Sequence, residues 1–125
     1  MKLIIAGGRD FNDYTLLQSK LDHLLQNIPT DSIEIVSGGA RGADSLGERY
    51  ANERGIKIKQ FIPEWKNPDG TTNRAAGHIR NRKMGDYADT LVAFWDGESK
   101  GTKGMIDYAI KKGLNVRVVR YALEN

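Results

Sequence analysis

Short apolar runs alternate along this chain with longer stretches of helical periodicity. The runs are rich in aliphatic and β-branched residues, and several are apolar throughout, which is typical of strands buried on both faces of a parallel sheet. They cover residues 2–6, 33–36, 56–62, 90–95 and 116–119. The run at 56–62 alternates apolar and polar residues, so we expect it to be an edge strand with one face exposed.

Between these runs, apolar residues recur at the spacing of a helix. The first helix is predicted from about Asp13 and is ended by Pro29, and the second follows Gly42 and stops at Gly55. The other two are predicted at residues 74–87 and 102–112, and residues 63–72 are predicted as a loop. Strands that alternate with helices predict an α/β fold, in which helices cover both faces of a five-stranded parallel sheet.

Length and composition are typical of one globular domain over residues 1–125. Hydrophobic residues make up 39% of the 125 positions and charged residues 28%, and no apolar run approaches the roughly 18 residues of a membrane span, so no membrane partner is expected. There are no cysteines, which excludes disulfides and thiolate sites, and we expect a cytoplasmic location. The net charge of +3 fits contact with phosphates but is modest for a dedicated duplex-DNA binder.

Three glycine-rich loops follow the first, second and fourth predicted strands. They are Gly7-Gly8-Arg9-Asp10, Ser37-Gly38-Gly39-Ala40-Arg41-Gly42 and Gly97-Glu98-Ser99-Lys100-Gly101-Thr102. Right-handed crossovers bring the carboxyl ends of all strands to one edge of the sheet, where ligands bind in such folds. A tight turn explains any one of these loops, but three at one edge favour an anion site made of backbone amides. Their spacing matches neither Gly-x-Gly-x-x-Gly nor a P-loop, so no cofactor is expected.

Charged and aromatic side chains near this edge each have two interpretations. Arg80 falls on the apolar face of the third helix, whereas Arg82 points away from it. The other members of that face are Ala76, Ile79, Met84, Tyr87 and Ala88. A cation there needs either a carboxylate, such as Asp10 or Asp44, or a bound phosphate. Asp44 itself either complements the helix dipole or contacts a ribose or base.

The aromatic residues are equally open. Trp95 at the end of the fourth strand either stacks on a base or closes the core, and Trp65 and Tyr14 either wedge a loop or contact ligand. His23 and His78 form no cluster with carboxylates at metal-ligand spacing, so no metal site is expected.

Together these motifs resemble the SLOG superfamily of Rossmann-like domains, and most closely its YspA-related branch. The resemblance covers nearly the whole chain and rests on residues 7–11, 37–44, 75–82, 93–97 and 99–102. It implies a three-layer Rossmann-like sandwich with sheet order 3-2-1-4-5, and a site for a nucleotide or nucleotide derivative built from the three loops. His78 stands where the branch commonly has proline.

We therefore expect a small nucleotide-like ligand, bound as part of a sensor or processing module. Amides of residues 38–42 and 99–102 would hold phosphate, and Arg80, with Arg9 or Lys100, would balance its charge. Asp10, Asp44 or Asp96 would contact sugar or base. The expected binding residues are Gly7, Gly8, Arg9, Asp10, Ser37, Gly38, Gly39, Ala40, Gly42, Asp44, Arg80, Asn81, Trp95, Asp96, Gly97, Ser99, Lys100, Gly101 and Thr102.

A more distant resemblance, to LOG-type phosphoribohydrolases, implies an alternative: hydrolysis of the N-glycosidic bond of a nucleoside monophosphate. That family carries His-x-Arg-Lys on the third helix, which falls on His78 and Arg80 when the chains are anchored at Ala88-Asp89; anchoring at Arg82-Lys83 would select Arg82 instead. The glutamate of its Pro-Gly-Gly-x-Gly-Thr-x-x-Glu motif falls on Met105.

The catalytic candidates that remain for this alternative are Arg80, Asp44 and Asp96. A third alternative is a nucleic-acid-binding module, as in DNA-processing relatives of the superfamily. A homodimer formed through a helix face also stays open.

Overall fold

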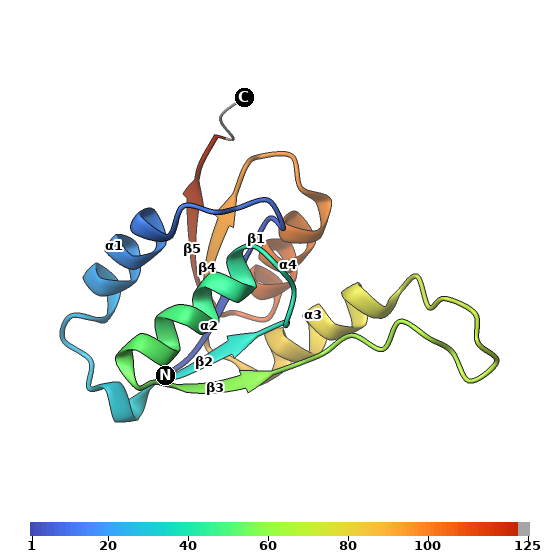
Figure 1. The fold of residues 1–125 in the computed structure, drawn as a ribbon, viewed down its shortest axis with the longest axis horizontal. Coiled ribbons are helices and arrows are strands. Elements are labelled where there is room, and N and C mark those ends of the chain that lie inside the picture. Colours follow the sequence, from blue (N-terminus) through green and yellow to red (C-terminus); the bar gives the residue numbers. More distant parts are fainter. Residues whose placement is uncertain (123–125) are drawn as a thin grey trace.

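The computed structural model describes residues 1–122, which form a parallel sheet between two pairs of helices (Figure 1). The strands are β1 (Lys2–Gly7), β2 (Glu34–Ser37), β3 (Lys57–Gln60), β4 (Thr90–Trp95) and β5 (Asn115–Arg120). The helices are α1 (Tyr14–Leu25), α2 (Ala43–Arg54), α3 (Ala76–Tyr87) and α4 (Lys100–Lys111), with a short 3-10 helix, η1 (Thr30–Ser32). The strand order is β3-β2-β1-β4-β5 with every pair parallel, which confirms the predicted fold and the order 3-2-1-4-5.

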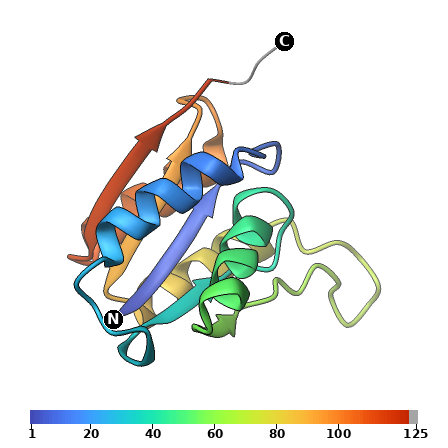
Figure 2. The same cartoon turned by 60° about the vertical axis from the view of Figure 1, so that its left-hand side comes forward.

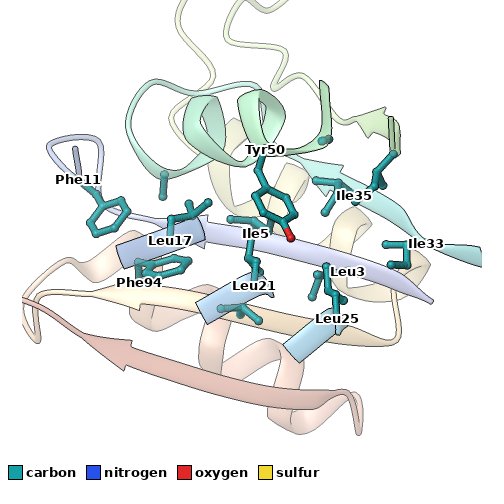
Figure 3. Packing of buried hydrophobic residues seen from close by; sticks show 14 residues of the cluster. Leu3, Ile5, Phe11, Leu17, Leu21, Leu25, Ile33, Ile35, Tyr50 and Phe94 are labelled. Atoms are coloured by element: carbon teal, nitrogen blue, oxygen red, sulfur yellow. The ribbon is translucent and has the colours of Figure 1, made fainter. Parts of the chain in front are cut away.

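The sheet separates two hydrophobic cores. Helices α1 and α2 cover one face and α3 and α4 cover the other (Figure 2). Side chains of successive strand residues point to opposite faces. Leu3 and Ile5 of β1 therefore pack with Leu17 and Leu21 of α1 (Figure 3), whereas Ile4 belongs to the core beneath α3 and α4. Burial on both faces explains why residues 3–6 of β1 are all apolar.

Capping side chains set the starts of two helices. The Asp13 carboxylate accepts the amide of Leu16 at 3.0 Å at the start of α1. Ser99 caps α4 by accepting the amide of Thr102 at 3.4 Å, so α4 begins at Lys100, two residues before the predicted start. As a result, Gly101 lies in the first turn of a helix and not in a loop. No helix within residues 1–122 has both the length and the apolar character needed to cross a membrane.

The apolar face of α3 is not buried along its whole length. Ile79, which the sequence places on that face, is 39% exposed, whereas Ala76 and Met84 on the same face are buried. Ile79 borders a surface depression together with Phe61 and Ile62, which come from the segment after β3. Helical periodicity gives the direction of a side chain around the helix axis, but not whether another element covers that part of the helix.

Between β3 and α3 the chain leaves the sheet as a long projection, residues 61–75, which we call the arm (Figure 1). The arm folds back on itself through an isolated antiparallel bridge between Lys66 and Thr72. The amide of Asn67 donates to the carbonyl of Thr71 at 2.8 Å. The predicted loop at 63–72 is therefore an ordered turn-back that returns the chain to the start of α3.

Candidate functional site

All three glycine-rich loops reach one pocket of about 460 Å³ at the carboxyl edge of the sheet. Its walls come from the ends of β1 and β4, the starts of α2 and α4, one side of α3, and the arm. The lining residues that the sequence predicted are Gly7, Gly8, Arg9, Asp10, Ala40, Asp44, Arg80, Asn81, Asp96, Ser99, Gly101 and Thr102. Segments more than ninety residues apart thus contribute to one cavity.

The first and second loops touch through their backbones. The amide of Ala43 donates to the carbonyl of Gly8 at 3.3 Å. Gly42 has φ +78°, and a Cβ atom there would overlap the Gly8 carbonyl oxygen and lie 2.6 Å from the carbonyl of Arg9. Glycine at this position allows both the positive φ and the close approach of the two loops.

Two amides of the second loop are already satisfied within the protein. The amide of Gly39 donates to Ser37 Oγ at 3.1 Å, and the amide of Ala40 donates to Asp44 Oδ2 at 3.1 Å. Ser37 Oγ in turn donates to Glu48 at 2.6 Å. The second loop is therefore a less open cradle for an anion than its glycine content predicts.

The start of α4 is more open. Asp96 Oδ1 accepts the amides of Glu98 and Ser99, both at 2.8 Å. Within residues 1–122, the next two amides, those of Lys100 and Gly101, donate to no protein acceptor. Free amides in the first turn carry the positive end of the helix dipole, so an anion is stabilised there.

Arg80 is held in place by neutral oxygen atoms. Its Nε donates to Asn81 Oδ1 at 2.9 Å, and its Nη1 donates to the carbonyl of Gly38. Among the described residues, no ion pair joins this half-buried guanidinium to Asp10 or Asp44. Burial lowers the pKa of Arg80, and the charge of Asp44 acts in the opposite direction. The structure thus presents an oriented cation to the pocket without a bonded carboxylate.

Two carboxylates of the pocket, Asp44 and Asp96, are opposite in character. Burial raises the pKa of Asp44 to about 6, against the opposing effects of the Ala40 amide and the charge of Arg80. The amides of Ser99 and Glu98 lower the pKa of Asp96, which therefore stays ionised. Asp44 alone of this pair changes charge close to neutral pH.

Several predicted residues lie outside the pocket lining. They are Ser37, Gly38, Gly39, Gly42, Trp95, Gly97 and Lys100. Ser37 is buried at 1% exposure, and the Trp95 indole packs on the core and donates from Nε1 to the Ser99 carbonyl at 3.1 Å. Gly38 and Gly39 instead line a neighbouring depression of about 480 Å³, which also includes Arg9 and Trp65.

The pocket also has lining residues that were not among the predicted binding residues. They are Ala6, Trp65, Arg74, Gly77, His78, Met84, Met105 and Tyr121. Tyr121 directly follows β5, whose carboxyl end reaches the same edge, so the topology alone could have identified it. Met105 is buried in the place that the LOG-type resemblance gives to a glutamate.

The sequence of this chain matches a known family and a known relative. A model described as "YspA, cpYpsA-related SLOG family" matches residues 1–67. The Gene 61 protein of Mycobacterium phage D29 is 32% identical over 120 residues, which cover 92% of this chain and 93% of that protein.

Two solved structures of DNA processing protein A (DprA) are also similar. The protein from Streptococcus pneumoniae has a TM-score of 0.76 at 16% identity. The protein from Helicobacter pylori, whose structure is described for its unique single-stranded DNA binding mode, has a TM-score of 0.74 at 20% identity. Each match covers 98% of this chain, which spans 51% and 66% of the two DprA chains respectively. At these identities the likeness shows the fold.

Proposed function

This chain belongs to the YspA, cpYpsA-related SLOG family, and we propose that it binds a nucleotide or a nucleotide derivative in the pocket at the carboxyl edge of its sheet. The observation that carries the proposal is the convergence of the three glycine-rich loops on one cavity, together with Arg80, which has no carboxylate bonded to it. A volume of about 460 Å³ is in the range of small-molecule sites.

In this proposal the phosphate lies at the start of α4, against the free amide of Gly101, which lines the pocket. The guanidinium of Arg80 balances its charge, and the exposed carboxylate of Asp10 accepts hydrogen bonds from ribose hydroxyl groups. The buried thioether of Met105 cannot serve as the base that the LOG-type glutamate supplies, so we propose binding of the ligand and no hydrolysis that depends on this position.

Isothermal titration with nucleoside monophosphates, nucleoside diphosphates and ADP-ribose tests the proposal. At least one of them is expected to bind. Arg80→Ala is expected to lower the affinity for that ligand by roughly ten- to a hundredfold, as for a lost charge-assisted hydrogen bond. Arg82→Ala is the matched control, because Arg82 is an exposed cation on the same helix outside this pocket. Failure of all these ligands to bind the folded protein would refute the proposal.

Gly101 offers a second test, with Gly104 as its control. A Cβ atom at either position meets no protein atom within 4 Å, but Gly101 lines the pocket and Gly104 does not. Alanine is expected to leave the free energy of unfolding unchanged or raise it by up to about 1 kcal/mol at both sites, because alanine favours helix. Only Gly101→Ala is expected to lower the affinity for the ligand, measured by titration. Equal affinities for the two variants would argue against a phosphate at the start of α4.

Binding of single-stranded nucleic acid is a second candidate. It is favoured by three exposed arginines, Arg9, Arg41 and Arg74, which line the pocket or the depression beside it. The similarity to DprA, whose Helicobacter pylori structure is described for its single-stranded DNA binding mode, favours the same candidate. Affinity for an oligonucleotide that falls steeply with salt concentration, without affinity for mononucleotides, would select this candidate.

A further inference from the structure

We propose that Trp65 is a stacking surface for a nucleobase, so that the pocket selects ligands that carry a base over simple sugar phosphates. This inference rests on the proposed function, which places a phosphate at the start of α4. It adds the arm as the part of the protein that recognises the base. The same base chemistry is presented by a free nucleotide and by the end of a DNA strand, and the experiment below separates the two.

The Trp65 indole has apolar surface that no other side chain in the described part of the chain covers at the rim of the site. It is 43% exposed, yet it lines both the 460 Å³ pocket and the neighbouring depression of about 480 Å³. Within residues 1–122, no aromatic ring or cation stacks on it. Trp95 differs, since the Arg120 guanidinium lies 5.2 Å from its ring centre.

Backbone contacts hold Trp65 at this rim. The carbonyl of Trp65 accepts the amide of Asn73, which ties the two sides of the arm together beside the Lys66–Thr72 bridge. The carbonyl of Asn73 accepts the amide of Ala76 at 3.2 Å and so joins the arm to the first residue of α3. A Cβ atom on Gly77 would lie 3.6 Å from the tip of the indole, so the ring lies against the first turn of α3.

The rest of the pocket suits a sugar phosphate better than a base. Charge and hydrogen bonds come from Arg9, Asp10 and Arg80. Met105, which also lines the pocket, is buried at 1% exposure. The other large aromatic ring of the lining, that of Tyr121, already packs edge-on against Phe11 at 4.7 Å between ring centres. Trp65 is the large flat apolar group left open to a ligand, and indole faces stack on any nucleobase.

The test compares AMP, UMP and ribose 5-phosphate by isothermal titration against the wild-type protein, Trp65→Ala and Trp65→Phe. Trp65→Ala is expected to lower the affinity for the nucleotides by roughly tenfold or more, as for a lost base–aromatic stack. The affinity for ribose 5-phosphate is expected to change by less than about twofold. Trp65→Phe keeps a ring and is expected to retain most of the affinity. Lys66→Ala is the control for disturbance of the arm, since Lys66 is exposed and lines neither cavity.

Fluorescence gives an independent reading. The chain has two tryptophans, so a Trp95→Phe protein reports on Trp65 alone, and a stacked base is expected to quench it. A 5′-phosphorylated oligonucleotide in the same assay identifies the source of the base: Trp65-dependent affinity for the strand but not for AMP or UMP supports the stacking surface and assigns the base to DNA.

The outcomes keep the two proposals apart. Nucleotides that bind equally well to wild-type protein and Trp65→Ala would overturn the stacking surface and leave the proposed function standing. Equal losses of nucleotide and ribose 5-phosphate would also overturn it, because Trp65 would then only shape the pocket. If neither nucleotides, sugar phosphate nor oligonucleotide bind the wild-type protein, the proposed function fails and this inference fails with it.

Discussion

Replacing Gly42 with alanine is expected to lower the free energy of unfolding by about 3 kcal/mol or more. Gly42 has φ +78° and ψ −127°, a backbone conformation that side chains other than glycine rarely adopt. The added methyl group would also meet the carbonyls of Gly8 and Arg9, which are backbone atoms and cannot rotate away as a side chain can. Relief therefore requires the first loop to move away from the second.

Gly55 supplies the matched control at the other end of α2. Its φ of +67° is also positive, but a Cβ atom there meets nothing within 4 Å. Gly55→Ala is expected to cost only about 1 kcal/mol, from the left-handed conformation alone. Urea denaturation of both variants measures the difference. Similar losses would mean that the two loops are not packed against each other as described.

The same contact distinguishes stability from ligand binding. Since loop movement is the route by which Gly42→Ala relieves overlap, protein that still folds is expected to have a distorted pocket and weaker nucleotide binding than Gly55→Ala. A folded Gly42→Ala protein with wild-type affinity would indicate that the approach of the first two loops is not needed for the site.

The sequence predicted the strand order through its resemblance to a family, and it predicted the common edge of the glycine-rich loops through the rules of parallel sheets. The common edge follows from apolar runs and crossover handedness, which local patterns carry, whereas the strand order came from the resemblance alone. Periodicity placed Ile79 on the apolar face of α3 but did not give its exposure, because coverage of α3 depends on where the arm leaves the sheet. The sequence could not decide between the two roles of Trp65, packing in a loop or contacting ligand, for the same reason. The position of the arm is set by its return through Asn73, a long-range feature with no periodic signal.

Hydrogen bonding within the loops was harder still to anticipate. Glycine content predicted free amides throughout the second loop, but Ser37 and Asp44 accept two of them. Those bonds depend on side-chain geometry that spacing does not specify. Conversely, the Ser99 cap moved the start of α4 so that Gly101 lies at its first turn, which concentrates the free amides in one place. The site is thus less evenly shared among the three loops than the glycine pattern indicates.

Asp44→Asn is expected to raise the free energy of unfolding at pH 8 by about 1–3 kcal/mol, following from roughly 1.4 kcal/mol for each pKa unit. Burial raises the pKa of Asp44 from 3.8 to about 6 in the folded protein. The folded chain therefore binds this proton more tightly than the unfolded chain does. The stability of the wild-type protein gained from this group is present below about pH 4 and declines as the pH rises toward 6. Asparagine remains neutral and still offers an oxygen to the Ala40 amide.

Denaturation curves of both proteins between pH 4 and pH 8 measure this effect. The gain from Asp44→Asn is expected to be close to zero at pH 4 and to reach its full size above pH 7, because only the wild-type carboxyl loses its proton. Asp10→Asn is the control, since Asp10 is an exposed carboxyl in the same pocket, and it is expected to change stability little at either pH. A constant difference between Asp44→Asn and the wild-type protein across this range would show that Asp44 is not the buried acid that titrates near pH 6.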